Sequence, residues 1–280
     1  MIEATKSVVI SDEELRSFTS SIHQRHGIDF SCYEPQSLKY KIVQSLPAFN
    51  VESVHELWAI ILKEYILIFP FMNEISGGLT SMFRDPVLWN EVLTLLKRKF
   101  YQYPELAIWH AGCSTGEEVY TMSIVLRESG YSGKTKTRAT DISKQALETA
   151  KSGIYPKTKL EEYKKNYSRY NPAGTLTTYF AKDNHDESLD TNLINHVEFQ
   201  YHNLITSPFV ETYDIIFCCN VMIYFDNRAK QKLLDKFYQS LNEGGILVVG
   251  FYDVALPLID ESKFELVDLN TNIFRKVTYK

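Results

Sequence analysis

The spacing of apolar residues changes once along the chain, and the change predicts two kinds of domain. The segment SDEELRSFTSSIHQRH begins with Ser11 and has Glu14 three positions later, which is a capping-box signal. SVHELWAIILKEYILIF begins with a second signal of this kind, and QSLKYKIVQSL between the two also has helical spacing. No strand is expected before about residue 106, so residues 1–76 are predicted to form an all-helical domain.

From Leu106 onward, short apolar runs alternate with helical patterns. The strand candidates are LAIWHAG, TKTRATDI, HVEFQYHN, YDIIFCCNVMIYF, GILVVGF, KFELVDL and IFRKVTYK; the helix candidates are EEVYTMSIVLRESG, SKQALETAKSG and RAKQKLLDKFYQSLN. This alternation predicts an α/β domain over residues 106–280, with a mostly parallel sheet and helices on both faces. Residues 77–105 are interpreted as a linker, and residues 156–195 are expected to hold a helix or two with loops.

Composition and charge exclude several classes of function. The net charge is -5 and no cluster of cations is present, which argues against nucleic-acid binding. The most apolar run, Leu57 to Met72, is interrupted by Lys63 and Glu64, and no signal peptide is recognisable, so a cytoplasmic monomer without membrane insertion is expected. The four cysteines show no metal-binding spacing. Cys218 and Cys219 are therefore expected to be packing residues of a strand.

The run AGCSTGEE, residues 111–118, follows the first predicted strand and opens a helix. Its glycines let the backbone approach a ligand closely. The spacing is not GxGxxG, and Glu117 and Glu118 at the helix start would repel a pyrophosphate, which disfavours a nicotinamide-dependent oxidoreductase. An ammonium or sulfonium ligand suits this acidic turn better. The alternative is that both glutamates only complement the helix dipole.

Asp141 ends the second predicted strand, where an acid can accept hydrogen bonds from both hydroxyls of a ribose. Its alternative role is the N-cap of the helix that follows at once. The glycine-containing turn and this acid, about 25 residues further on, together indicate a nucleoside cofactor.

The runs WHAGCSTGEEVYTMSIVL, ATDISKQALETAKSGIY and FCCNVMIYFDNRAKQKLLDKFYQSLNEGGILVVG, preceded by GLTSMFRDPVLW, resemble the CheR-type chemotaxis receptor methyltransferases in order, wording and spacing. The likeness covers nearly the whole chain. It implies a class I S-adenosylmethionine-dependent methyltransferase, with a Rossmann-like, mostly parallel seven-stranded sheet that follows the helical domain in the sequence. It also implies that S-adenosylmethionine methylates glutamate side chains of methyl-accepting chemotaxis receptors, giving a methyl ester and S-adenosylhomocysteine.

The resemblance also assigns roles to individual residues. The positions that correspond to the family's cofactor site are Thr80, Arg84, Glu118, Asp141, Asn203, Leu204, Cys219 and Asn220. Arg84 would in addition steer the acceptor carboxylate, and Tyr224 matches an aromatic residue beside the reacting centre. On composition alone Arg84 is equally an exposed partner of Asp85, and Tyr224 a core residue of an apolar strand.

Methylation of a carboxylate requires no acid-base catalysis from the protein. A glutamate carboxylate with a pKa near 4.3 is ionised at neutral pH, so its attack on a sulfonium methyl group needs no general base. The protein has to align the reacting atoms and remove water from the nucleophile. The lack of a recognisable Ser/His/Asp or Cys/His arrangement is therefore no objection.

The sequence departs from the family's pattern in several places. Cys219 stands where the family commonly has an arginine, and GFYD replaces the usual GHSE after a late strand. The resemblance also makes residues 77–105 a segment that helps close the cofactor site, and there Gly78 replaces an asparagine. The second helix carries only Lys39 and Lys41, and Met1 to Ile75 holds six Lys and Arg against ten Asp and Glu. These departures keep open a different acidic helical protein as the substrate, or a non-catalytic cofactor-binding scaffold or sensor.

Overall fold

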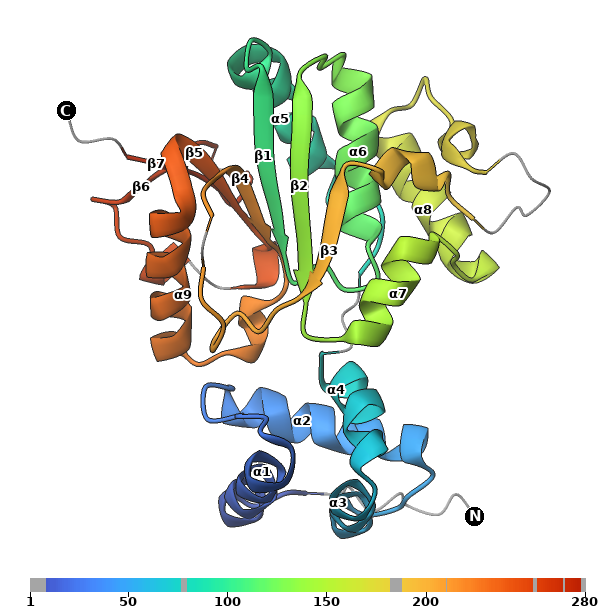
Figure 1. Cartoon of the computed structure of the whole chain (residues 1–280), viewed down its shortest axis with the longest axis vertical. Coiled ribbons are helices and arrows are strands. Elements are labelled where there is room, and N and C mark those ends of the chain that lie inside the picture. Colours follow the sequence, from blue (N-terminus) through green and yellow to red (C-terminus); the bar gives the residue numbers. More distant parts are fainter. Residues whose placement is uncertain are drawn as a thin grey trace. The chain divides into compact units, whose positions relative to one another are not determined.

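The computed structural model describes residues 9–76, 80–181, 188–209, 211–253, 256–268 and 270–277. The chain forms two compact units (Figure 1). The helical unit comprises Met1–Gly77 and Ile223–Lys230, and the sheet unit comprises Gly78–Met222 and Gln231–Lys280. The segment Ile223–Lys230 is thus far from the rest of its unit in sequence.

The described part of the helical unit holds α1 (Asp12–His26), α2 (Pro35–Ser45), α3 (Val54–Lys63) and α4 (Ile68–Ser76). The capping box predicted at Ser11 is confirmed, because Ser11 Oγ accepts from Glu14 N–H at 3.1 Å and Glu14 Oε2 accepts from Ser11 N–H at 2.8 Å. The helices bury one apolar stripe each around Phe18, whose ring meets Trp58 and Phe71 edge-on.

The long helical pattern that begins at Ser53 is two helices and not one. After α3 ends, Glu64 is extended at φ -110° and ψ 101°, and a 3₁₀ turn over Tyr65–Leu67 leads into α4. Pro70 gives the physical reason, because its missing N–H is tolerated in the first turn of α4 but would break the interior of a continuous helix.

The sheet has seven strands among the described residues: β1 (Glu105–Ala111), β2 (Lys134–Asp141), β3 (Val197–Tyr201), β4 (Tyr213–Cys218), β5 (Leu241–Val249), β6 (Phe264–Leu266) and β7 (Ile273–Lys276). Their order is β3-β2-β1-β4-β5-β7-β6; the first five in this order are parallel, and β7 is antiparallel to both its neighbours. This arrangement confirms the predicted class I methyltransferase sheet. The strand order reverses between β1 and β4, where ligands of such sheets bind.

Helices cover both faces of the sheet. They are α5 (Pro86–Leu95), α6 (Glu117–Ser129), α7 (Lys144–Ser152), α8 (Lys157–Tyr170) and α9 (Asn227–Ser240), and a π-helical turn, Leu96–Phe100, extends α5. Successive strand residues point to opposite faces. His110 of β1 contacts Glu118 of α6, whereas Trp109 contacts Phe237 of α9, so α6 and α9 lie on opposite faces (Figure 1).

Two predicted elements end earlier than expected. The apolar run over residues 213–225 is a strand only to Cys218, after which Asn220 adopts φ +61° and a 3₁₀ turn covers Met222–Tyr224. The turn looked like strand because residues 221–225, VMIYF, are as apolar as the strand that precedes them. The helix expected to reach residue 242 ends at Ser240, and Leu241 already begins β5.

The remaining short elements are 3₁₀ turns: Leu46–Phe49, Leu176–Tyr179, Thr191–Ile194, Phe251–Asp253 and Leu256–Leu258. Residues 156–195 thus hold α8 and two of these turns, as expected, while residues 182–187 lie outside the described part. Within the described residues, none of the helices is long and apolar enough to cross a lipid bilayer.

Candidate functional site

The turn between β1 and α6 is held in an unusual backbone conformation. Gly112, Ser114 and Gly116 all have positive φ, at +86°, +49° and +92°. A Cβ atom at Gly116 would lie 2.6 Å from the Cβ atom of Ala150 in α7, so the turn packs directly against the neighbouring helix. Non-glycine residues adopt positive φ rarely, and when they do they cluster at functional sites.

Asp141 ties this turn to the end of β2. Its Oδ2 accepts from Ser114 N–H and its Oδ1 from Ser143 N–H, each at 2.8 Å. Burial raises the pKa of the Asp141 carboxyl, and these backbone hydrogen bonds only partly offset the rise. An ionised carboxylate has about four lone-pair sites, so Asp141 keeps capacity to accept from a ligand. The N-cap interpretation of Asp141 is wrong, because Ser143 caps α7 by accepting from Ala146 N–H.

The two adjacent glutamates of α6 have different environments. Glu117 is fully buried and accepts hydrogen bonds from Lys159 Nζ at 2.9 Å, Tyr163 Oη at 2.7 Å and Thr115 Oγ1 at 2.6 Å. Burial and the Glu117 charge raise the pKa of Tyr163, so its hydroxyl remains a donor. Glu117 therefore links α6 to α8 inside the unit.

Glu118 lies at the switch point between β1 and β4. Its Oε1 lies 2.7 Å from Nδ1 of His110, a buried residue whose ring stacks on Phe217 at a centroid distance of 4.9 Å. Cys219 Sγ donates to the carbonyl oxygen of Val248 at 3.9 Å, and the nearby Glu118 charge raises the pKa of this thiol. Glu118 keeps 19% of its side-chain surface exposed. Of the two glutamates, Glu118 is the one that can meet a ligand.

The thiols around these acids are neutral. Burial raises the pKa of Cys113 well above its ordinary value, and the charges of Asp141 and Glu118 raise it further. The pKa of Cys219 is raised in the same way by burial and by Glu118 and Asp253. Cys218 is a buried residue of β4, as predicted, whereas Cys219 lies beyond the strand end and is half-buried. The described groups at this edge thus favour a cationic ligand.

The turn after β4 is fixed by a carboxylate that the sequence interpretation missed. Asp253 is fully buried, and its Oδ2 accepts from Asn220 N–H at 2.6 Å and from Gly250 N–H at 3.0 Å. The available signal was the last residue of GFYD, which retains the acidic character of the family's GHSE although the other residues change.

Asn203 and Leu204 lie in the turn after β3. Asn203 Oδ1 accepts from Ile205 N–H at 2.9 Å, and Leu204 is buried. His202 N–H donates to the carbonyl oxygen of Asp141 at 3.0 Å, which places this turn beside the end of β2. The structure therefore brings the turns after β1, β2, β3 and β4 to one edge of the sheet.

Arg84 lies between two residues in the left-handed region, Phe83 at φ +48° and Asp85 at φ +57°. Phe83 N–H donates to Thr121 Oγ1 of α6 at 3.1 Å, and the carbonyl oxygen of Arg84 accepts from Trp89 Nε1 at 3.0 Å. Thr80 is half-buried at the start of this segment, and Gly78 lies outside the described residues. The Arg84 segment is thus fixed against the helix that carries Glu118.

Tyr224 belongs to the helical unit. Its carbonyl oxygen accepts from Glu34 N–H at 2.9 Å, and Lys41 Nζ of α2 lies 5.4 Å from the centroid of its ring. Burial lowers the pKa of Lys41. Lys39, the other cation of α2, pairs with Asp12 at 2.6 Å. Both lysines of α2 therefore make contacts within their own unit.

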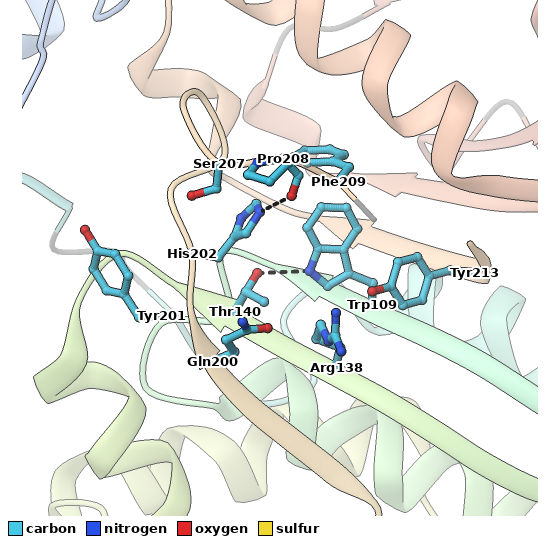
Figure 2. A pocket seen from close by; sticks show the side chains of 10 residues that line it. All are labelled: Trp109, Arg138, Thr140, Gln200, Tyr201, His202, Ser207, Pro208, Phe209 and Tyr213. Carbon is cyan, nitrogen blue, oxygen red and sulfur yellow. Dashed lines mark hydrogen bonds between the residues drawn. The ribbon is translucent and has the colours of Figure 1, made fainter. Parts of the chain in front are cut away.

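A cavity of about 230 Å³ opens on the face of the sheet that α9 covers (Figure 2). Trp109, Arg138, Thr140 and His202 are among its lining residues. Trp109 points away from the His110 face of β1, so this cavity is separate from the Glu118 site. Among the described residues, no group of three or more His, Cys, Asp or Glu side chains could hold a metal ion.

Comparisons with known proteins agree with this arrangement. The family described as CheR methyltransferase, SAM binding domain, matches residues 79–273. The protein named Cher3 of Pseudomonas putida is 32% identical over 270 residues, covering 95% of this chain and 97% of its own length. Chemotaxis protein methyltransferases of Listeria monocytogenes and Salmonella typhimurium are 24% and 28% identical, covering 92% and 93% of this chain and 95% and 90% of their own lengths.

Proposed function

The chain belongs to the CheR methyltransferase family, and we propose that it transfers the methyl group of S-adenosylmethionine to glutamate side chains of a methyl-accepting chemotaxis receptor. It is a methyltransferase with S-adenosylmethionine as its cofactor, since the matched region is the SAM binding domain. The names of the Listeria and Salmonella relatives support a role in chemotaxis. All four cysteines are free, which suits the reducing cytoplasm.

The observation that carries this proposal is the pair of acids at the switch point of the sheet. S-adenosylmethionine has two ribose hydroxyls, an ammonium and a sulfonium, and a ligand of this kind needs acceptors and negative charge. Asp141 keeps accepting capacity beside a glycine-containing turn, and Glu118 is partly exposed among neutral thiols. We assign the ribose to Asp141 and the ammonium to Glu118, with Thr80, Asn203, Leu204, Cys219 and Asn220 completing the site.

The remaining residues act on the acceptor. The cofactor supplies a methyl group on a positively charged sulfur. The ionised carboxylate would form the O–CH3 bond as the S–CH3 bond breaks and S-adenosylhomocysteine leaves, so no general base is needed. We assign to Arg84 the attraction and orientation of that carboxylate, because its backbone is fixed on both sides. Tyr224 would hold the reacting geometry and exclude water from the nucleophile.

A second candidate, a cofactor-binding scaffold or sensor without transferase activity, is favoured by two observations. Cys219 stands where the family has an arginine, and the two lysines of α2 make contacts inside their unit. Both candidates bind the cofactor, so binding does not separate them. A non-receptor acidic protein as the methyl acceptor is the corresponding alternative within the enzyme class.

Transfer of a labelled methyl group to receptor fragments tests the proposal. We expect label on wild-type fragments, release of that label by mild base, as for a methyl ester, and none on fragments whose acceptor glutamates are replaced by alanine. Arg84→Ala should lose transfer and keep binding of S-adenosylhomocysteine within about ten-fold, because its main assigned partner is the acceptor. Binding of cofactor with no transfer to any receptor fragment would favour the scaffold.

A further inference from the structure

We propose that Asp253 is a positioning residue of the cofactor site, whose carboxylate holds the turn after β4 against the turn after β5 and so fixes Cys219 and Asn220. The inference rests on the proposed role of those two residues in cofactor binding. Asp253 belongs to the GFYD segment, which departs from the family's wording.

The geometry is that of a single carboxylate oxygen shared by two backbone amides. Asp253 Oδ2 accepts from Asn220 N–H at 2.6 Å and from Gly250 N–H at 3.0 Å, and Asp253 has no exposed surface. Hydrogen bonds to an ionised acceptor are about twice as strong as neutral ones. A buried carboxylate is tolerated only with such partners, so Asp253 and the two turns stabilise one another.

The two turns approach so closely that Gly250 has no room for a side chain. A Cβ atom there would lie 2.6 Å from the Asn220 nitrogen and 2.7 Å from Asp253 Oδ2. The carbonyl side of Gly250 is held by Asn272, the residue before β7, whose Nδ2 donates to the Gly250 carbonyl oxygen at 3.3 Å. Gly250 is therefore held on one side by Asn272 and packs on the other side against the turn after β4.

Asn220 needs this support because of its backbone conformation. At φ +61° it is in the left-handed region, which asparagine tolerates better than most residues but which still costs free energy. Such a conformation persists only where the surroundings hold it. The hydrogen bond from Asn220 N–H to Asp253 is a direct constraint on that residue.

Two parts of the proposed site depend on this constraint. Cys219, next to Asn220 in the chain, is close enough to Glu118, the residue assigned to the cofactor ammonium, for the Glu118 charge to raise the pKa of its thiol. Tyr224 follows Asn220 by only four residues. Loss of the Asp253 carboxylate should therefore weaken cofactor binding, and it should also disturb the start of the segment that leads to Tyr224.

The test is calorimetric titration of S-adenosylhomocysteine into the full-length protein and its variants. Asp253→Ala removes the acceptor of the Asn220 and Gly250 amides and should weaken binding about ten-fold or more. Asp253→Asn keeps one acceptor oxygen and should weaken binding less. Asp253→Glu, which restores the carboxylate, should recover part of the affinity. In steady-state assays the KM for S-adenosylmethionine should rise in the same order.

A matched control is Asp260→Ala, because Asp260 also accepts from a backbone amide, Ser262 N–H at 2.9 Å, but on an exposed turn away from the site. It should leave the Kd unchanged. If Asp253→Ala does not fold, the Kd of the isosteric variant Asp253→Asn tests the proposal. A folded Asp253 variant with lowered Tm and wild-type Kd would show that Asp253 is only structural. The Kd does not depend on the methyl acceptor, so failure of receptor methylation would leave this inference standing.

Discussion

Two turns at the same edge of the sheet are built alike and used differently. After β1, Ser114 at φ +49° donates its N–H to Asp141; after β4, Asn220 at φ +61° donates its N–H to Asp253. In both places a buried aspartate holds a residue with positive φ: Asp141 is the last residue of the neighbouring strand β2, and Asp253 lies in the 3₁₀ turn that follows the neighbouring strand β5. Each aspartate also accepts a second backbone amide, from Ser143 and Gly250 respectively.

The two carboxylates differ in whether a ligand can reach them. Asp141 uses one oxygen for each amide and is 9% exposed, whereas Asp253 uses Oδ2 for both amides and is 0% exposed. A ligand can therefore reach Asp141 and not Asp253. The same local device thus serves for binding in one turn and for positioning in the other.

The largest effect that separates the two turns is expected from Asp141→Ala. It removes the proposed acceptor of two ribose hydroxyls together with the constraint on the turn after β1. Two hydrogen bonds to a charged acceptor contribute about 3 kcal/mol, so binding of S-adenosylhomocysteine should weaken about 100-fold or more. Calorimetric titration measures this change. An affinity no weaker than that of Asp253→Ala would mean that both aspartates only position the backbone.

The sequence predicted the features of these turns that depend only on residues close together in the chain. Asp141 is the last residue of a strand, and strand ends are the expected ligand positions of a parallel sheet. The strand and helix alternation and the capping box at Ser11 are local in the same sense. Each could be inferred because neighbouring residues alone determine it.

The remaining features depend on contacts between distant segments. Asp253 follows β5 in a 3₁₀ turn, and its partner Asn220 is 33 positions earlier in the chain. Glu117 and Glu118 are adjacent, and only the packing of α8 decides which of them is buried. The turn after Cys218 was taken for strand because it is equally apolar. Tertiary packing decided each of these features, and no local pattern carries that information.

Glycine substitutions test how tightly each turn is packed. Gly250→Ala would place its Cβ 2.6 Å from the Asn220 backbone, whereas Gly112→Ala would first meet the Val221 side chain, whose Cγ2 lies at 2.4 Å and can move. Gly250→Ala should lower the free energy of unfolding by about 2–3 kcal/mol through overpacking. For Gly112→Ala the expected loss is smaller, about 1–2 kcal/mol, chiefly from its positive φ.

Urea denaturation of the two variants measures these losses. Gly130→Ala is the control, because Gly130 has φ +72° and nothing within 4 Å of an added Cβ atom, so it reports the cost of the backbone conformation alone. If Gly250→Ala costs no more than Gly130→Ala, the turn after β5 is loose and the role assigned to Asp253 loses its basis.

Replacing the residues with positive φ by glycine compares the strain in the two turns. Ser114→Gly should raise the free energy of unfolding by about 0.5 kcal/mol, since relief of about 1–2 kcal/mol of strain exceeds the added chain entropy of glycine. Asn220→Gly should be nearly neutral, because asparagine already tolerates this conformation. Asn50→Gly, at φ +52° in the helical unit, is the control for Asn220. A loss of stability in Ser114→Gly would show that the serine side chain supports the turn.

The smallest effect is a pH dependence that should distinguish Asp141 from exposed carboxylates. Burial raises the pKa of Asp141 above its ordinary value of 3.8, so folding favours the protonated form. This favourable contribution is complete below pH 3.8 and is lost as the pH rises through the raised pKa. The Tm of Asp141→Asn minus the Tm of the wild type should therefore increase as the pH rises from about 4 to about 7.

Asp12 is the matched case of opposite sign. Its hydrogen bond and ion pair with Lys39 lower its pKa below 3.8, so its stabilising contribution is present at higher pH and is lost as the pH falls through the lowered pKa. Between about pH 4 and pH 7 the Tm difference between Asp12→Asn and wild type should therefore stay nearly constant. Thermal melts of both variants over this range measure the two slopes. If the Tm difference between variant and wild type has the same pH slope for both variants, Asp141 ionises as an exposed carboxylate does. The description of Asp141 as a buried acid that binds the ligand would then be wrong.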